Sequence, residues 1–323
     1  MAETPLVSII TPSFNQAAFL EKTMRSVLEQ DYPAIEYMVV DGGSTDESVE
    51  IIKRYSANLA WWVSEKDSGQ AEAINKGLSR AKGEFVAWLN SDDYLMPGAV
   101  ASAVKALMAN PDSSFVYGNV RVVAPDQTIL NQLTYKDWKL KDLMAFHIIG
   151  QPAVFMQRSD LEKTGFLDPS YHLLLDHHLW IRLASVGGMT YVPQLWASAH
   201  YHEDCKNLKQ AAEFGKEALR IVEWMPTQPA LLAEFKLHRK EILAGANRIN
   251  GFYLLDAKEY RKAFRAYWKS FSLNPCGLGR EWYRMVFAFF APLGLEKLRT
   301  RFIKRRVTQQ NTVNSRDCGD GEY

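Results

Sequence analysis

The chain has 323 residues, which is enough for one large catalytic domain with a smaller unit, or for two domains. Hydrophobic residues make up 47% and charged residues 23%, the balance of a globular protein with ample apolar material for a core. The 38 Lys and Arg residues against 37 Asp and Glu leave a formal net charge of +1. No global positive charge therefore points to a nucleic-acid partner.

The cysteines and the N-terminal stretch bear on the compartment. Cys205, Cys276 and Cys318 are few, odd in number and far apart, which predicts reduced thiols in the cytoplasm. The stretch MAETPLVSII carries an acid where a signal peptide has basic residues, so we expect no targeting peptide. No stretch reaches the roughly 18 apolar residues of a membrane span.

Apolar runs alternate with amphipathic stretches through the first hundred residues. Runs rich in β-branched and aromatic residues predict strands at 7–11, 37–40, 60–65 and 84–89. The helical spacing of apolar residues between these runs predicts helices, the first with Asn15 as its N-cap. This order predicts an α/β fold with a mixed, mostly parallel sheet flanked by helices.

Polar residues follow each of the four predicted strands, at 12–15, 41–44, 65–67 and 90–93. Taken singly, an acid such as Asp41 could be a turn former or a helix cap. Caps have no need to converge, however, and ligands of such sheets bind beyond the carboxyl ends of the strands. No GxGxxG follows the first strand and no GxxxxGKS or GxxxxGKT occurs, so the sequence favours a ligand site without a glycine-rich phosphate cradle.

The octapeptide WLNSDDYL at 88–95 places two adjacent carboxylates, Asp92 and Asp93, at the end of an apolar run. Like charges so close repel each other and resist desolvation, which a divalent cation would offset. Hard divalent cations take carboxylate oxygens together with substrate phosphate oxygens. With Asn90 alongside, the pattern predicts Mg²⁺ or Mn²⁺ bound to a diphosphate.

Three segments carry a family resemblance: 7–55, SEKDSGQAEAINKGL at 64–78 and GEFVAWLNSDDYL at 83–95. Over roughly residues 6–205, the chain closely resembles the family 2 glycosyltransferases of the GT-A fold. The resemblance implies an inverting enzyme that uses a nucleotide-diphosphate sugar as its donor.

The resemblance also implies which residues hold the donor. The segment 11–15 matches the wall around the base and ribose, Asp41 matches the carboxylate that hydrogen-bonds the base, and Asp67 matches a donor-contacting acid. The implied nucleotide-sugar ligands are Thr11, Pro12, Phe14, Asn15, Asp41, Asp67, Gln70, Lys76, Asn90, Ser91 and Asp92.

The implied metal ligands are Asp92, Asp93 and His202. Asp92 matches the final acid of the D-x-D metal motif, whose first position here is the neutral Asn90, so the metal site relies more on Asp93. His200 and His202 form an H-x-H pair, and on a strand both rings point to one face, where they could ligate a metal. The family often has R-x-H at this place, and His202 is the match, although a lone histidine is more often structural.

The segment LDHHLWIRLAS at 175–185 has apolar residues at helical spacing, and Asp176 stands at its start. From position alone, Asp176 could be an N-cap. The family has D-x-D-L-W-x-R-L here, and its first acid resembles the catalytic base, which makes Asp176 the implied base and puts His178 in place of the second acid. A positioned carboxylate that removes the acceptor proton contributes roughly 10²–10⁴ in rate. Gln151 and Pro152 resemble the strand that lines the acceptor pocket.

The last third of the chain changes character. We expect a GT-A catalytic domain at 1–205 (donor half 1–100, acceptor half 101–205), a helical region at 206–306 and a disordered tail at 307–323. Residues 245–275 resemble one tetratricopeptide-type helix pair, but an ordinary helical hairpin packed on the catalytic domain is the simpler interpretation. The apolar stretch 285–295 precedes KLRTRFIKRR, which has six basic residues and no acid. This pattern suits docking on an anionic membrane, with internal packing as the alternative.

The sequence therefore predicts an inverting glycosyltransferase that moves a sugar from a nucleotide-diphosphate donor to a glycan or lipid-linked acceptor. We expect it in bacterial surface polysaccharide or glycolipid assembly, in the cytoplasm or peripherally on the inner face of the plasma membrane. A sugar-1-phosphate nucleotidyltransferase would show a glycine- and basic-rich loop after the first strand, which TPSFNQAAFL lacks. A non-catalytic scaffold that keeps the fold is the other alternative.

Overall fold

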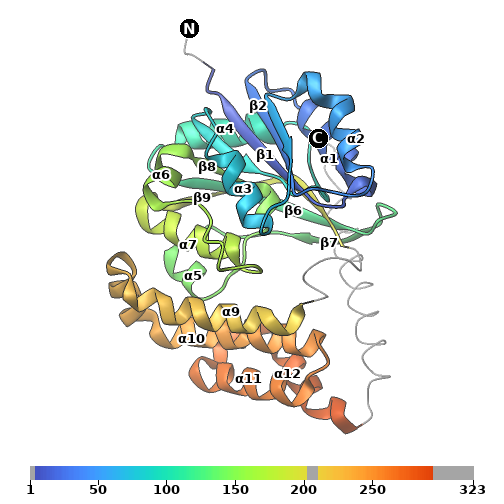
Figure 1. Ribbon diagram of the computed structural model, residues 1–323. Coiled ribbons are helices and arrows are strands. Elements are labelled where there is room, and N and C mark those ends of the chain that lie inside the picture. The colour runs from blue at the N-terminus through green and yellow to red at the C-terminus, as the bar shows by residue number, and fades with distance from the viewer. Residues whose placement is uncertain (1–3, 202–209, 294–323) are drawn as a thin grey trace, which may run out of the picture.

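The computed structural model describes residues 4–201 and 210–293 (Figure 1). Within them, nine strands form one sheet in the order β3-β2-β1-β4-β8-β6-β9-β5, with β7 beside β6. The strands are β1 (Val7–Ser13), β2 (Ile35–Asp41), β3 (Trp61–Ser64), β4 (Phe85–Trp88), β5 (Asp93–Leu95), β6 (Phe115–Val123), β7 (Ile129–Leu133), β8 (Val154–Gln157) and β9 (Met189–His200). The helices are α1 (Ala17–Leu28), α2 (Ser48–Tyr55), α3 (Gln70–Leu78), α4 (Ala99–Ala109), α5 (Leu140–Met144), α6 (Arg158–Thr164), α7 (Leu175–Gly187), α9 (Ala211–Trp224), α10 (Pro229–Asp256), α11 (Tyr260–Leu273) and α12 (Trp282–Phe290).

The four strands predicted from the first hundred residues are present, with ends that differ by one or two residues from those expected. Strands β1 to β4 pair in parallel. Their carboxyl ends therefore meet at one edge of the sheet, as the sequence predicts. The second half adds antiparallel pairs, β4 with β8, β6 with β8, β6 with β7 and β5 with β9. The sheet is mixed, and its parallel part carries the predicted ligand edge.

The two faces of the sheet bury separate apolar clusters, because side chains alternate along each strand. Val7 and Ile9 of β1 face α1, α2 and α4 in one cluster. Ile10 faces the other way, into a cluster with α3, α6 and α7. That second cluster continues into α9 and α10 through residues such as Phe214 and Ile242. The helical region therefore shares a core with the sheet.

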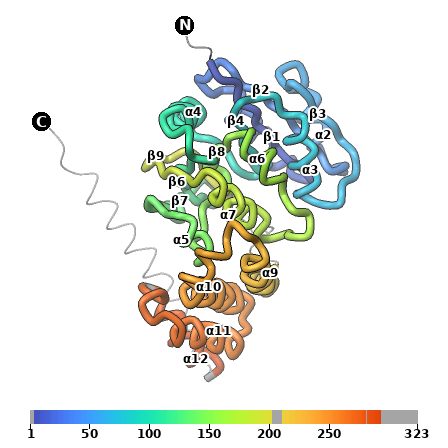
Figure 2. The backbone as a smooth tube through the Cα atoms, turned by 90° about the vertical axis from the view of Figure 1, so that its left-hand side faces the viewer, coloured from blue at the N-terminus to red at the C-terminus, as the bar shows by residue number. Residues whose placement is uncertain are grey.

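Helices α9 to α12 lie below α5 and α7 (Figure 2). Helix α10 approaches the end of α5 so closely that a Cβ at Gly245 would lie 1.9 Å from the carbonyl oxygen of Ala145. Arg248, about one turn further along α10, donates a hydrogen bond to the carbonyl of Phe146. This packing supports the interpretation of α10 and α11 as a helical hairpin on the catalytic part of the chain.

The predictions about compartment can be compared with the structure only in part. No helix within residues 4–201 and 210–293 is long and apolar enough to cross a bilayer. Cys276 carries an exposed thiol, whereas Cys205 and Cys318 lie outside the described residues. The basic segment and the tail, at 297–306 and 307–323, also lie outside them.

The close approach at Gly245 gives a stability prediction. We expect Gly245→Ala to lower the free energy of unfolding by about 1–3 kcal/mol, because the added methyl group must displace the α5 backbone. The loss should appear although alanine favours a helix by about 1 kcal/mol over glycine. Urea unfolding measures it, with the exposed Lys240→Ala on the same helix as control. Equal stability of the two variants would contradict the packing described here.

Candidate active site

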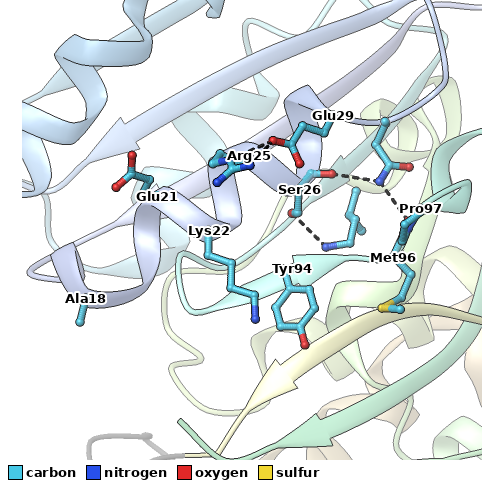
Figure 3. Close-up of a pocket in the computed structure, with 11 residues that line it drawn as sticks. Ala18, Glu21, Lys22, Arg25, Ser26, Glu29, Tyr94, Met96 and Pro97 are labelled. Carbon is cyan, nitrogen blue, oxygen red and sulfur yellow. Dashed lines mark hydrogen bonds and ion pairs between the residues drawn. The ribbon is translucent and has the colours of Figure 1, made fainter. Parts of the chain in front are cut away.

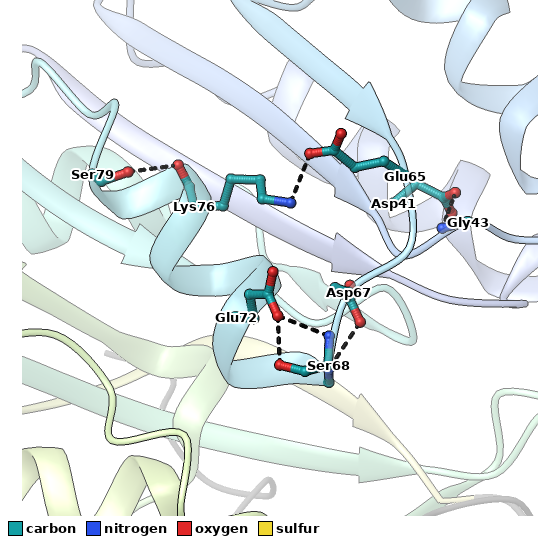
Figure 4. A network of polar contacts seen from close by, with 9 residues as sticks. Asp41, Gly43, Glu65, Asp67, Ser68, Glu72, Lys76 and Ser79 are labelled. Atoms are coloured by element: carbon teal, nitrogen blue, oxygen red, sulfur yellow. Dashed lines mark hydrogen bonds and ion pairs between the residues drawn. The ribbon is translucent and has the colours of Figure 1, made fainter.

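Asp41 ends β2 at the carboxyl edge of the sheet and is fully buried. Its Oδ2 accepts hydrogen bonds from the backbone N–H of Gly43 (3.1 Å) and Ser44 (2.9 Å) and from the hydroxyl of Ser64 (2.7 Å). Its Oδ1 accepts one bond, from the Ser44 hydroxyl at 2.5 Å. The carboxylate therefore braces the turn after β2 (Figure 4), and Oδ1 keeps capacity for a further donor. The sequence places Ser44 in the polar stretch 41–44, but sequence reasoning missed Ser64, since a serine at a strand end carries no specific signal.

Asp67 lies against the same turn. A Cβ at Gly42 would lie 2.6 Å from its Oδ2, so the glycine allows this close approach. Burial raises the pKa of Asp67, an effect that its hydrogen bond from the Gly69 N–H (2.9 Å) opposes. Lys76 points instead to Glu65, with its Nζ 2.8 Å from a carboxylate oxygen (Figure 4).

Gln70, Asn90 and Asp93 form a chain of side-chain hydrogen bonds across the crevice. The Gln70 Nε2 donates to the Asn90 Oδ1 at 2.8 Å, and the Asn90 Nδ2 lies 3.3 Å from the Asp93 Oδ2. Asp93 is buried, and burial together with the neighbouring charge of Asp92 raises its pKa well above the usual range. Asp92 is half-buried, and Ser91 is buried beside it. The folded chain therefore buries Asp93 beside Asp92, and the negatively charged form of Asp93 is unfavourable there, as the sequence predicts.

The end of β1 forms the remaining wall. Thr11 is buried and its hydroxyl lies 3.0 Å from the Tyr37 hydroxyl, so a nucleotide would meet its backbone rather than its side chain. Pro12 is also buried, whereas Phe14 is 59% exposed. Asn15 has a left-handed backbone with φ of 52°, and its Oδ1 accepts from the Thr45 N–H at 2.9 Å.

The prediction that Asn15 caps the first helix is wrong. Its side chain ties β1 to the turn after β2, and Asp46 supplies the cap from that turn. One Asp46 oxygen accepts from the Ala17 N–H of α1 at 3.0 Å, and the other accepts from the Ser48 N–H of α2 at 3.0 Å. One carboxylate therefore serves two helix N-termini, which are favourable places for negative charge.

Asp176 lies in the first turn of α7 and is half-buried. Burial raises its pKa to about 6, while its hydrogen bond from the His177 N–H (2.7 Å) opposes the rise. One turn further along α7, the Trp180 ring stacks on Trp88 with centroids 5.1 Å apart. Because Trp88 is the last residue of β4, this stack joins the helix of Asp176 to the strand that leads into the 90–93 turn.

His178 does not lie where a second acid could act. Its ring is buried between Tyr171 and Trp224, with centroids 4.3 and 4.4 Å away, and burial lowers its pKa to about 3. Gln151 and Pro152 form a 3-10 turn ahead of β8 instead of the expected strand. The Gln151 Nε2 donates to the Trp88 carbonyl at 2.7 Å, which adds a second tie to the Trp88 stack.

The structure describes one of the two histidines of the H-x-H pair. His200 ends β9, and its two ring nitrogens lie 2.5 Å from the Asp92 carbonyl and 2.9 Å from the Gln127 Nε2. His202 lies outside the described residues. Among residues 4–201 and 210–293, no three His, Cys, Asp or Glu side chains are grouped as a metal-ligand set. The prediction of His202 as a ligand stays a prediction.

A surface hollow of about 640 Å³ lies beside α1 and β5 (Figure 3). Lys22 and Arg25 of α1 and Tyr94 of β5 line it, and the Lys22 ammonium lies 3.7 Å from the centre of the Tyr94 ring. None of the predicted site residues lines this hollow. The candidate site at the strand ends is therefore separate from this hollow.

Residues 8–174 match the family model described as glycosyl transferase family 2, slightly more than half of the chain. The chain belongs to this family. It is 33% identical over 193 residues to TuaG of Bacillus subtilis (strain 168), a glycosyltransferase named for teichuronic acid biosynthesis, covering 58% of this chain and 75% of TuaG. It is 28% identical over 209 residues to the hyaluronan synthase of Pasteurella multocida, covering 64% of this chain and 21% of the synthase. The family 2 match makes the chain a glycosyltransferase and replaces the nucleotidyltransferase and scaffold alternatives.

Solved structures share the fold of this family 2 chain. TarS residues 1–349 of S. aureus, in complex with UDP-GlcNAc, aligns with a TM-score of 0.63 and 17% identity, covering 96% of this chain and 92% of that one. The mannosyltransferase PcManGT of Pyrobaculum calidifontis, in complex with GDP-Man and Mn²⁺, aligns with a TM-score of 0.59 and 22% identity, covering 90% and 87%. The GT-A fold expected from the sequence is confirmed, and the likeness extends over the C-terminal helices.

The contact between Gly42 and Asp67 gives a prediction for the site. We expect Gly42→Ala to lower the free energy of unfolding by about 1–3 kcal/mol, because its methyl group must displace the Asp67 carboxylate. In an Asp67→Ala background the same change should cost much less, since the obstructing group is gone. Urea unfolding of the two single variants and the double variant measures the coupling. Additive effects would show that the two residues do not meet.

Proposed function

We propose that this family 2 glycosyltransferase transfers a sugar, with inversion, from a nucleotide-diphosphate donor to an acceptor hydroxyl. One observation carries the proposal. Asp176, a half-buried acid with a pKa raised to about 6, is tied by the Trp180–Trp88 stack to the acidic turn at 90–93. This stack supports the proposal, because it would hold a proton acceptor at a fixed distance from a site for an anionic leaving group.

The donor would bind along the carboxyl ends of β1, β2 and β4. Asp41 supports this assignment, because its Oδ1 keeps acceptor capacity for an N–H of the base. The exposed ring of Phe14 and the backbone at Thr11 and Pro12 would line the base and ribose. Asp67 lies next to Asp41 across Gly42, in reach of the same ligand.

The residues present fit a divalent cation. Asp92 and Asp93 are adjacent hard oxygen donors, and the pKa of Asp93 is raised by burial and by the neighbouring charge of Asp92, both of which a cation would offset. We propose that Asp92 and Asp93, with His202, hold Mg²⁺ or Mn²⁺, while Asn90 orients Asp93 from the side. When bound, the cation would act as a Lewis acid and stabilise the negative charge of the leaving diphosphate. The complex of PcManGT with GDP-Man and Mn²⁺ supports this choice.

Asp176 would act as the general base. Its carboxylate accepts the acceptor hydroxyl proton as the acceptor oxygen forms a bond to the anomeric carbon. The bond from that carbon to the diphosphate oxygen breaks on the opposite face, and the nucleoside diphosphate leaves with the electron pair. Attack and departure on opposite faces invert the anomeric centre, by the geometric logic that separates inverting from retaining glycosidases.

The relatives support a polymeric acceptor. TuaG is named for teichuronic acid biosynthesis, and other relatives are hyaluronan and chondroitin synthases of Pasteurella multocida. We therefore propose a glycan or lipid-linked acceptor in bacterial surface polysaccharide assembly, with the donor bound on the cytoplasmic side.

Two substitutions separate the roles. Asp92→Ala should abolish Mn²⁺-dependent binding of the nucleotide, whereas Asp176→Ala should leave that binding intact and lower kcat by roughly 10²–10⁴. In the wild type, kcat should decline as the pH falls through about 6, because a protonated Asp176 cannot accept the proton. Calorimetric titration with UDP, GDP and dTDP, with and without Mn²⁺, tests the binding, and donor turnover against pH tests the base. Near-normal turnover by Asp176→Ala would remove it from this role.

We also propose that α11 and α12 dock on an anionic membrane. Their rings form an aromatic patch, in which Phe264 contacts Trp268 and Phe289 at centroid distances of 6.2 and 5.2 Å. Trp268 and Phe289 are 55% and 53% exposed. The patch consists of Phe264, Trp268, Phe271, Phe289 and Phe290.

The charge beside the aromatic patch favours a lipid surface. Helix α11 carries no acid, and its Arg261, Lys262, Arg265 and Lys269 are all exposed. Helix α12 also carries no acid, and six basic residues follow at 297–306. Aromatic rings flanked by cations are suited to the headgroup region of an anionic bilayer. This surface would bring the enzyme to a lipid-linked acceptor.

Vesicle binding tests the docking surface. The protein should co-sediment with vesicles of phosphatidylcholine and phosphatidylglycerol, and less with phosphatidylcholine alone, because the basic residues need anionic headgroups. Trp268→Ser should weaken vesicle binding about tenfold, because the apolar area of the indole ring no longer enters the bilayer. Leu237→Ser, a 75% exposed apolar residue of α10 outside the patch, is the matched control. Self-association through the patch without vesicle binding would contradict the proposal.

A further inference from the structure

Glu217 of α9 binds the backbone just ahead of α7. Its Oε1 accepts a hydrogen bond from the N–H of His172 at 2.8 Å. Its Oε2 accepts from the N–H of Leu173 at 2.9 Å and of Leu174 at 2.8 Å. Both carboxylate oxygens are therefore engaged by the segment that leads into α7, two to four residues before Asp176.

Backbone N–H groups at the start of a helix need partners from outside the helix. The N-cap residue of α7 is Leu174, whose apolar side chain cannot accept a hydrogen bond from these N–H groups. A carboxylate is well suited to this place, because it accepts strong hydrogen bonds and its charge complements the helix dipole. Glu217 thus accepts a hydrogen bond from the N–H of the N-cap residue of α7, across a separation of more than forty residues in sequence.

Arg220, on the same face of α9, holds the preceding part of the segment. Its guanidinium donates to the Ser170 carbonyl at 2.7 Å and lies over the Tyr171 ring at 4.2 Å from the centroid. Two charged side chains of α9 therefore fix residues 170–174 on both sides of Tyr171. These contacts restrain the backbone of residues 170–174 and so the direction in which the chain enters α7.

We propose that Glu217 is a positioning residue of the glycosyl transfer: by holding residues 172–174, it fixes where the Asp176 carboxylate stands relative to the donor. The inference rests on the proposed role of Asp176 as the base. It makes the helical region part of the catalytic apparatus, because the position of the base depends on α9 packing against α7.

The charge of Glu217 also acts on Asp176. Burial is the main cause of the raised pKa of Asp176, and the negative charge of Glu217 adds to the rise. Among the described residues, Tyr253 of α10 also interacts with Asp176, and its pKa is raised by burial and further by the Asp176 charge, so it stays neutral. Removing the Glu217 charge should therefore lower the pKa of Asp176 and move the acid limb of the kcat profile to lower pH.

The test uses the full chain and measures kcat, either for sugar transfer from donor to acceptor or for hydrolysis of the donor alone. Glu217→Gln keeps the shape of the side chain but removes the charge and one of its two acceptor oxygens. We expect kcat to fall about tenfold to a hundredfold, as for a displaced catalytic group, with nucleotide affinity unchanged. The acid limb should move to lower pH. Glu213→Gln, one turn earlier on α9 and paired with Lys216 at the surface, should behave as the wild type in each measurement.

A second variant separates charge from position. Glu217→Asp keeps the charge on a side chain shorter by one methylene, so kcat should fall while the acid limb stays near the wild-type pH. An active wild type with Glu217→Gln indistinguishable from Glu213→Gln would overturn the positioning role alone. A wild type that transfers no sugar from any nucleotide donor would overturn the proposed function and this inference together.

Discussion

The stack of Trp88 on Trp180 is the contact on which the candidate site depends. Both rings are buried, and each belongs to an element that leads to candidate site residues. Trp88 ends the strand that leads to the acids at 90–93, and Trp180 lies one turn after Asp176. Close-packed rings allow little relative movement, so Asp176 and the acidic turn keep a fixed spacing. Gln151 reinforces the arrangement through the Trp88 carbonyl.

The site holds its acids in different environments, and these suit different tasks. Asp41 is fully buried but accepts four hydrogen bonds, which compensate its negative charge. Asp93 is buried beside Asp92, and burial together with that neighbouring charge makes its charged form unfavourable, although hydrogen bonds from the Asn90 amide and the His200 backbone oppose the effect. Asp176 lies between these cases, with a pKa near 6 that suits a proton acceptor.

Two of the C-terminal helices, α9 and α10, share an apolar core with the sheet. The apolar cluster that contains Ile10 of β1 also contains Phe214 of α9 and Ile242 of α10. Glu217 and Arg220 add polar ties to the segment before α7. The outer helices, α11 and α12, have a small cluster of their own and leave the aromatic patch exposed. The region therefore packs on the candidate active-site part of the chain through α9 and α10 and exposes aromatic rings on α11 and α12.

The sequence by itself determined the strands of the parallel half and the acids at their ends, because apolar runs and the turn residues after them are local patterns. It also determined the family. Only the tertiary structure decided that Asp46 also caps α1, that Glu217 binds the N-cap residue of α7, that Asn15 caps no helix, and that His178 is buried between rings. These outcomes depend on which backbone N–H groups and side chains meet after packing, and no pattern along the chain encodes such long-range contacts.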